Sequence, residues 1–192
     1  MSIFIARHGE TDDNAKRIIQ MPNAPLSNNG LQQAKQLAQR LSQMNITRIL
    51  ASDYERAKQT ALQAGTSTGV KVEFNENLRE QNFGDLRGRA YDDLDTNPFA
   101  TDYQAPNGES WPTFCKRVAI AWQDITEAAS NIEGNLLIVT HGFVCKALLE
   151  NHLTLPKGLL ASSSYGNTAL TQVGAQPPWT IQLLNCTAHL NQ

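Results

Sequence analysis

The protein has 192 residues, of which 41% are hydrophobic and 18% are charged. At roughly 100 to 200 residues per domain, this composition predicts one folded domain and excludes a disordered, collagen-like or coiled-coil chain. With 16 Lys+Arg against 18 Asp+Glu, the formal net charge is −2, so the chain lacks the general basic surface that nucleic-acid or anionic-membrane binding requires.

The first half of the chain alternates apolar runs with helical patterns, as layered α/β proteins with largely parallel sheets do. Residues 3–6 form the first apolar run. Ser27 then precedes a helix whose buried side repeats every three or four residues: Leu31, Ala34, Leu37, Leu41 and Met44. Residues 49–51 predict the next strand. Ser52 and Glu55 have the spacing of a capping box, so they predict the start of a helix with a narrow apolar side formed by Tyr54, Ala57, Ala61 and Ala64.

The second half contains one long irregular segment between regular elements. Residues 70–74 alternate as a strand does, whereas residues 80–109 are rich in Asp, Asn, Gly and Pro and predict an irregular lid. Ser110 and Pro112 predict the start of a long helix that reaches Ala129. Further on, the pattern predicts a central strand at 136–139, a helix at 143–149, and a final hairpin or edge pair at 170–173 and 179–184. Without repeats or a linker, residues 1–192 are expected to form a single domain.

Two of the predicted strands end in the same His-Gly pair. Residues 3–6 run into Arg7-His8-Gly9, and residues 136–139 run into Thr140-His141-Gly142. Ligands of open α/β sheets bind beyond the carboxyl ends of the strands, where the strand order reverses, so we expect His8 and His141 to face one crevice. Arg56 lies off the apolar side of its helix and is expected to reach the same crevice.

A pocket that contains two arginines and two histidines attracts an anion. Arg7 and Arg56 stay charged at any working pH, and their planar forks match phosphate oxygens. They also disfavour protonation of His8, whose neutral ring could attack phosphorus and form a covalent phosphoenzyme. Glu80, if desolvated in the irregular segment, would protonate the leaving alcohol and then activate water.

The other titratable groups are predicted to be structural or solvated. His152 and His189 lack a strand-end setting, and the cations expected in solvent, unless they line a substrate mouth, are Lys58, Arg79, Arg87 and Arg89. Three cysteines in no metal-like spacing predict neither a disulfide framework nor a structural zinc site. No apolar run approaches the ~20 residues of a membrane span, so we expect a cytoplasmic protein.

Six short motifs follow one another along the chain. They are Arg7-His8-Gly9-Glu10-Thr11 with Asn14, Pro25-Leu26-Ser27-x-x-Gly30, Ser52-x-x-x-Arg56-Ala57-x-Gln59-Thr60-Ala61, Leu78-Arg79-Glu80-x-x-Phe83-Gly84 with Gly88, Gly108-Glu109-Ser110, and Val139-Thr140-His141-Gly142. In this order they resemble the histidine phosphatase superfamily, the phosphoglycerate-mutase-like proteins, over nearly the whole chain.

The resemblance implies a three-layer α/β/α sandwich with a mostly parallel central sheet. It implies that His8 is the phosphorylated nucleophile and that Glu80 is the proton donor. It also implies a phosphate pocket and substrate contacts formed by Arg7, Asn14, Gln20, Arg56, His141 and Gly142. Met21 stands where the family commonly has glycine, which suggests a more apolar mouth to the pocket.

We therefore predict a metal-independent phosphomonoesterase of the family's phosphatase branch, acting on a small phosphorylated metabolite without a cofactor. Mutases of the family resemble one another in a long insertion after the acid motif, and here only residues 85–107 precede Gly108. The alternatives are a bisphosphoglycerate-dependent phosphoglycerate mutase and a catalytically weak anion-binding or protein-interaction module. The expected partner is a phosphorylated small molecule, with no nucleic acid or membrane, and the C-terminal strands could pair in a homodimer.

Overall fold

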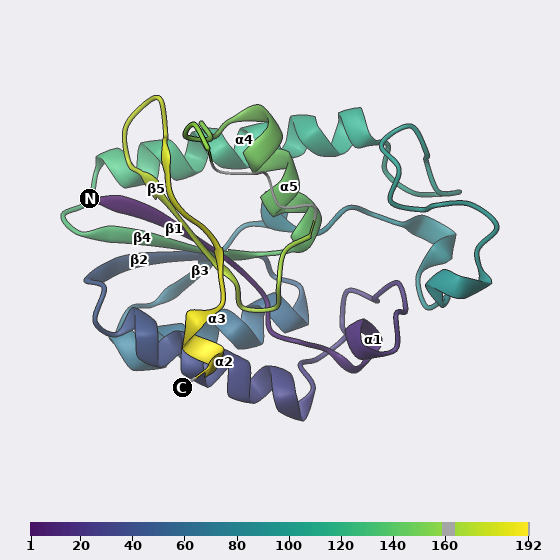
Figure 1. The fold of residues 1–192 in the computed structure, drawn as a ribbon, viewed down its shortest axis with the longest axis horizontal. Coiled ribbons are helices and arrows are strands. Elements are labelled where there is room, and N and C mark those ends of the chain that lie inside the picture. The colour runs from purple at the N-terminus through teal and green to yellow at the C-terminus, as the bar shows by residue number, and fades with distance from the viewer. Residues whose placement is uncertain (159–163, 192) are drawn as a thin grey trace.

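The computed structural model, which describes residues 1–158 and 164–191, has three layers with a sheet in the middle (Figure 1). The six strands lie in the order β3-β2-β4-β1-β5-β6. The parallel strands are β1 (Ser2–Arg7), β2 (Ile46–Ala51), β3 (Val72–Phe74) and β4 (Asn135–Thr140). β5 (Leu170–Gly174) and β6 (Ile181–Cys186) extend the sheet by antiparallel pairing. The predicted mostly parallel α/β/α sandwich and the final edge pair are confirmed.

Helices cover both faces of the sheet (Figure 1). α4 (Trp111–Ser130) and α5 (Gly142–Asn151) lie on one face, and α2 (Asn28–Leu41) and α3 (Glu55–Thr68) lie on the other. Successive residues of β1 point to opposite faces, so Ile3 and Ile5 pack in the first layer and Phe4 and Ala6 in the second. Burial on both faces explains why the central strands are continuous apolar runs.

The strand order reverses between the neighbouring strands β1 and β4. The chain leaves β1 toward α2 on one face of the sheet and leaves β4 directly into α5 on the other. Arg7 pairs in register with Thr140 at the carboxyl ends of these strands. The residues that follow, His8 and His141, therefore lie side by side at the switch point, where ligands of such sheets bind.

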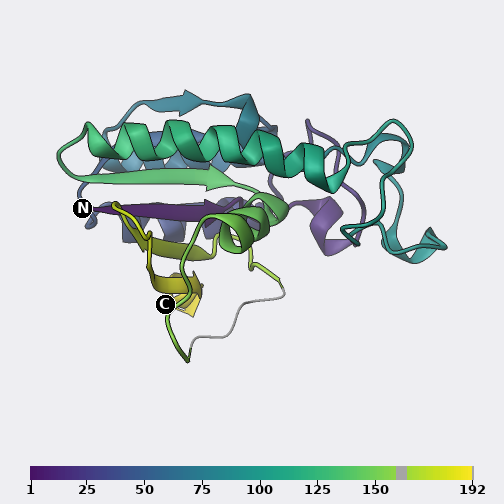
Figure 2. The same cartoon turned by 90° about the horizontal axis from the view of Figure 1, so that it is seen from above.

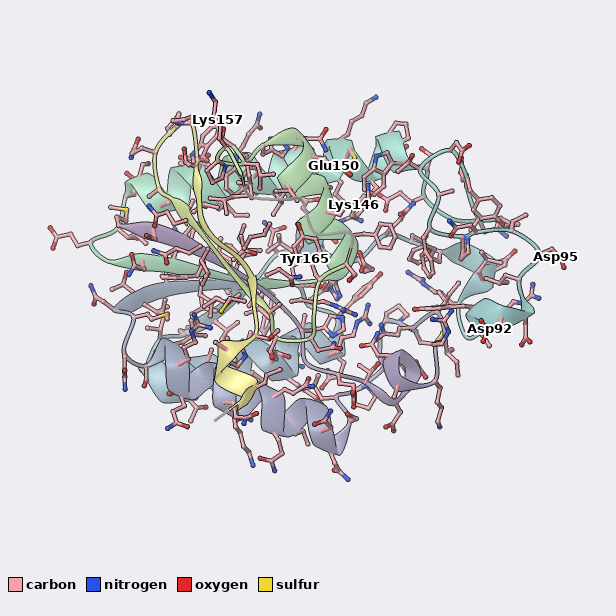
Figure 3. The ribbon with its side chains drawn as sticks, in the orientation of Figure 1. Asp92, Asp95, Lys146, Glu150, Lys157 and Tyr165 are labelled. Carbon is pink, nitrogen blue, oxygen red and sulfur yellow. The ribbon has the colours of Figure 1, made fainter. Side chains whose placement is uncertain are left out.

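The irregular segment lies beyond this same end of the sheet, together with the short helix α1 (Asp12–Ala15) (Figures 1 and 2). It contains two short 3-10 helices, Gly84–Leu86 and Tyr91–Asp93, as well as turns, and Asp92 and Asp95 lie at its outer tip (Figure 3). Gly84 has a φ of +49°, and a Cβ there would lie 2.0 Å from the Pro106 carbonyl oxygen. Only glycine fits this position, which closes the segment on itself.

Two of the three predicted helix caps are present. The side chains of Ser27 and Ser110 accept the backbone N–H groups of Gly30 and Thr113. The predicted capping box at Ser52 and Glu55 is wrong, because α3 begins at Glu55 and Ser52 is hydrogen-bonded to His141 instead. A short helix after His8 and the 3-10 turns were not predicted.

The three cysteines carry free thiols. Within residues 1–158 and 164–191, no helix has the length and apolar character needed to cross a membrane.

Candidate active site

The structure brings the two strand-end histidines together. Their ring centroids are 5.2 Å apart, and His8 and His141 are 1% and 0% exposed. The backbone N–H of His8 donates to the Thr140 carbonyl at 2.9 Å, which ties the two strand ends to each other. The prediction that the two imidazoles lie together is confirmed, because the paired strands β1 and β4 end at the same level.

The hydrogen bonds of His8 define which ring nitrogen carries the proton and which carries a lone pair. Nδ1 lies 2.7 Å from the Gly9 carbonyl oxygen, which can only accept, so Nδ1 carries the proton. Nε2 keeps its lone pair and accepts the Nε–H of Arg56 at 3.2 Å. Burial, reinforced by the positive charges of Arg56 and Arg7, lowers the pKa of His8 well below 6.5. His8 is therefore a neutral imidazole whose Nε2 carries the lone pair.

Arg56 is a buried cation at the start of α3. Its side chain is fixed by the Met21 carbonyl at 3.0 Å, and Thr60 one turn later hydrogen-bonds the N–H of Gly9. The residue is 2% exposed, and burial lowers its pKa to about 10, so it remains charged at neutral pH. No carboxylate of the described residues forms an ion pair with it. A buried charge without a partner is costly, and a bound anion would offset that cost.

Arg7 offers a second guanidinium beside the first. Its Nη1 donates to the Tyr165 carbonyl, whereas its buried Nε has no partner within the described chain. Arg7 likewise forms no ion pair with a described carboxylate. Two guanidinium groups without carboxylate partners thus meet next to the lone pair of His8.

Glu80 faces these arginines from the start of the irregular segment. Its two carboxyl oxygens accept the backbone N–H groups of Phe143 at 3.3 Å and Gln81 at 3.1 Å. Burial raises the pKa of Glu80, although the charge of Arg56 and these hydrogen bonds act in the opposite direction. Gly142 lies between Arg7 and Glu80: a Cβ there would stand 3.8 Å from Arg7 Nε and 3.9 Å from Glu80 Oε2.

Asn14 and Gln20 line the same pocket as Arg7, Arg56 and Glu80. The Oδ1 of Asn14 accepts the N–H of Thr11 and an N–H of Asn167, and the Thr11 hydroxyl donates to the Oε1 of Gln20 at 2.8 Å. Both amide oxygens accept hydrogen bonds, whereas the NH₂ group of each side chain has no partner among the described residues. Both residues line the pocket, so these donors suit an anion.

His141 is held by Ser52, the last residue before the turn into α3. The Ser52 hydroxyl accepts the N–H of Tyr54 at 3.3 Å and lies 2.8 Å from His141 Nε2. The other ring nitrogen, Nδ1, is buried without a partner in the described part of the chain. Burial, with Arg56, His8 and Arg7 nearby, lowers the pKa of His141 well below 6.5, so this ring is also neutral.

A pocket of about 290 Å³ opens above these groups. Among the described residues, four cationic side chains line it, against one carboxyl group, that of Glu80. The cations are Arg7, Arg56, Arg87 and Lys146, the last of which lies on α5 (Figure 3). His8 and His141 are not part of this lining, but they contact two of its residues, Arg56 and Tyr54. The positive lining explains how a chain of net charge −2 can attract an anion at one place.

The structure also places the groups that were expected to be structural or solvated. His189 is 3% exposed and hydrogen-bonded to Thr168, and His152 stacks on Trp122, so both are structural. Arg79 pairs with Asp53 at the surface. Arg87 is half-buried, lines the pocket and donates to the Tyr54 hydroxyl at 3.0 Å.

Sequence reasoning missed three contributors to the site. Tyr54 was assigned to the apolar side of α3, but its ring lies 5.5 Å from that of His141 and lines the pocket. Asn167 donates to the His8 carbonyl and to Asn14, and nothing in its local sequence indicates this. Arg117, in the first half of α4, donates to the carbonyls of Asn77 and Arg79, which precede Glu80 in the chain.

The interpretation of Met21 as an apolar part of the mouth is not supported by its position. Its side chain is 45% exposed and is not part of the pocket lining, and only its carbonyl contributes, by accepting from Arg56. Among the described residues, no group of three or more His, Cys, Asp or Glu side chains could hold a metal ion.

The family model of the histidine phosphatase superfamily (branch 1) matches residues 3–187. The protein named "Probable phosphoglycerate mutase GpmB" from Enterobacter sp. (strain 638) is 30% identical over 208 residues, covering 100% of this chain and 95% of its own length. A solved mycobacterial glucosyl-3-phosphoglycerate phosphatase in complex with VO3 is 25% identical, with a TM-score of 0.83 over 96% of this chain and 99% of that one. The phosphoglycerate mutase of Bacillus anthracis str. Sterne shares the fold, with a TM-score of 0.86 at 23% identity over 100% and 95% of the two chains.

Proposed function

Because this chain belongs to the histidine phosphatase superfamily, we propose that it is a phosphomonoesterase that hydrolyses a small phosphorylated metabolite through a phosphohistidine on His8. One observation carries the proposal: two guanidinium groups without carboxylate partners, those of Arg7 and Arg56, meet beside the lone pair of a neutral, buried imidazole. A phosphate dianion supplies the missing negative charge and places its phosphorus next to a nucleophile.

In the first step, the phosphate oxygens draw the Nε–H of Arg56 away from His8 Nε2 and free its lone pair. Nε2 attacks phosphorus in line, the N–P bond forms, and the bond to the ester oxygen breaks. Protonated Glu80 gives its proton to the departing oxygen, so a neutral alcohol leaves. In the second step Glu80 takes a proton from water, the hydroxide attacks phosphorus, and His8 is released with inorganic phosphate.

The surrounding donors stabilise the charge on the transferring group. We assign the free NH₂ groups of Asn14 and Gln20 to phosphoryl oxygens, and Gly142 leaves room between Arg7 and Glu80 for the ester oxygen. When the Ser52 hydroxyl donates to His141 Nε2, the proton of this ring sits on Nδ1, which becomes a further donor. Since four side-chain cations line the pocket, we propose that the reaction needs neither a metal nor a cofactor.

Hydrolase and mutase share the phosphohistidine and differ in the acceptor of the phosphoryl group. The short segment after the acid motif does not separate the two, because the protein named as a mutase above is covered over 95% of its own length by this chain. We favour the hydrolase because Phe83, Tyr91, Phe99 and Phe143 lie together in the pocket lining, and these rings offer few donors for the carboxylate and hydroxyl of a phosphoglycerate.

The two functions make opposite predictions for a phosphoglycerate substrate. With 3-phosphoglycerate and a catalytic amount of 2,3-bisphosphoglycerate, we expect the release of inorganic phosphate to exceed the formation of 2-phosphoglycerate, because water collects the phosphoryl group. Parallel assays of phosphate and of the isomer measure both rates. Isomerisation that outpaces phosphate release would establish the mutase instead.

Arg117 is proposed to position the segment that carries Glu80. This half-buried side chain pairs with Glu109 at 2.8 Å and donates to the carbonyls of Asn77 and Arg79. Arg117→Gln should lower the free energy of unfolding by about 1.5 to 3 kcal/mol, the range for hydrogen bonds to a charged group, and should reduce kcat more than it raises KM. Urea denaturation and steady-state kinetics measure the two effects.

The matched control for Arg117→Gln is Arg79→Gln, because Arg79 directly precedes Glu80 in the segment that Arg117 is proposed to position. Arg79 pairs with Asp53 and Glu76 at the surface, so its loss should change the free energy of unfolding by less than about 1 kcal/mol. Equal effects of the two substitutions on kcat would contradict a positioning role for Arg117.

The proposed partner is the phosphorylated small molecule itself, with no nucleic acid or membrane, in a cytoplasmic setting. β6 is an edge strand of the sheet, and a homodimer could form by pairing two such edges.

A further inference from the structure

Four aromatic rings form a continuous wall of the pocket: Phe83, Tyr91, Phe99 and Phe143. We call this set the ring wall. The ring of Phe99 stacks on Phe143 at 5.7 Å and meets Tyr91 edge-on at 4.8 Å, and Phe83 meets Phe143 edge-on at 5.7 Å. Three of the four residues come from the irregular segment and one comes from α5, so the wall joins two parts of the fold.

The ring wall adjoins the group that is proposed to protonate the leaving alcohol. The backbone N–H of Phe143 donates to the Oε2 of Glu80 at 3.3 Å. Because Glu80 must reach the ester oxygen, the part of the substrate attached to that oxygen lies against Phe143 and its neighbours. The ring wall therefore contacts the leaving group rather than the phosphate.

Three of the polar side chains that line the pocket with the ring wall already have partners. Lys146 pairs with Glu150 and lies over the Trp111 ring, Arg87 donates to the Tyr54 hydroxyl, and Gln81 donates to the Glu109 carbonyl. A leaving group rich in hydroxyls would lose hydrogen bonds to water where it lies against Phe83, Phe99 and Phe143, because their rings carry no hydrogen-bonding group. A planar apolar ring would instead pack against the aromatic rings that line the pocket.

We propose that the substrate is a phosphomonoester whose leaving group carries a planar ring next to the ester oxygen. This inference rests on the proposed function and specifies its substrate class. The pocket volume of about 290 Å³ is at the small end of ligand sites, which span roughly 300 to 1,000 Å³, so it suits one ring system in addition to the phosphate.

Benzyl phosphate and glycerol 3-phosphate test this preference, because both release a primary alcohol and so need similar help from Glu80. We expect kcat/KM for benzyl phosphate to be at least tenfold higher. Equal values, or a preference for glycerol 3-phosphate, would overturn the ring inference and leave the phosphatase proposal intact. Failure to hydrolyse any phosphomonoester would instead contradict the proposed function.

Replacement of Phe99 tests the ring wall directly. Phe99→Leu keeps an apolar side chain but removes the aromatic face, so KM for benzyl phosphate should rise about tenfold while kcat/KM for glycerol 3-phosphate changes less than twofold. Tyr91→Leu provides a second variant should Phe99→Leu fail to fold, as judged by circular dichroism. Phe74→Leu is the matched control, since Phe74 is 46% exposed and is not part of the pocket lining. An equal loss on both substrates would overturn the inference.

Discussion

Replacing His8 with alanine is expected to lower the hydrolysis of 4-nitrophenyl phosphate by roughly 10⁴-fold or more, as the loss of a nucleophile does in other covalent enzymes. The remaining pocket still holds Arg7 and Arg56, so the variant should bind inorganic phosphate and yet fail to transfer it. Steady-state assays in the presence of EDTA measure the loss and also test metal independence.

His152→Ala is the matched control for this prediction. His152 stacks on Trp122 and lies outside the pocket lining, so its loss should leave kcat within about twofold of the parent value. If the His8 variant retains activity, the nucleophile has been wrongly assigned. If the parent protein binds phosphate tightly without turnover, the chain is the anion-binding module considered above.

Glu80→Gln is expected to slow the release of poor leaving groups far more than that of good ones. General acid catalysis contributes roughly 10²- to 10⁴-fold, so kcat for benzyl phosphate should fall by at least about 10²-fold. 4-Nitrophenolate leaves without a proton, so formation of the phosphoenzyme from 4-nitrophenyl phosphate should change little. A pre-steady-state burst of 4-nitrophenolate measures that step. Equal decreases in kcat for benzyl phosphate and in the rate of the 4-nitrophenolate burst would show that Glu80 is not the general acid.

The pH profile provides a second test of the same residue. Glu80 must be protonated to act as an acid, so kcat/KM for benzyl phosphate should fall as the pH rises through its pKa, which burial places above the usual 4.5. His8 must be neutral, and its lowered pKa keeps it so at any pH above 6.5. Glu80→Gln should abolish the alkaline decline, whereas Glu76→Gln, on an exposed carboxyl, should preserve it. An unchanged profile in Glu80→Gln would contradict the assignment.

The sequence was sufficient to place the two histidines because they immediately follow strands. A strand-end residue is located by the sheet itself, and the neighbouring registers of β1 and β4 put His8 and His141 at the same level. Arg56 was placed by the same logic, through the first turn of a helix that follows a strand.

Contacts between distant segments were beyond this reasoning. Ser52 has the spacing of a helix cap, but its hydroxyl is hydrogen-bonded to His141, which lies 89 residues away in the sequence. Asn167 reaches Asn14 across 153 residues, and the ring wall assembles from a segment without periodicity. Short patterns describe local backbone preferences, whereas these contacts depend on how loops at one end of the sheet fold over one another.

The central claim is a covalent phosphate on His8. Detection of labelled protein after rapid quenching without acid tests this claim most directly. With ³²P-labelled benzyl phosphate, the parent protein should carry up to one label per chain. The label should be stable in alkali and lost in acid, and peptide mass spectrometry should map it to His8. The His8→Ala variant should carry none. Label on another residue, or steady hydrolysis with no labelled protein at any time, would contradict the account.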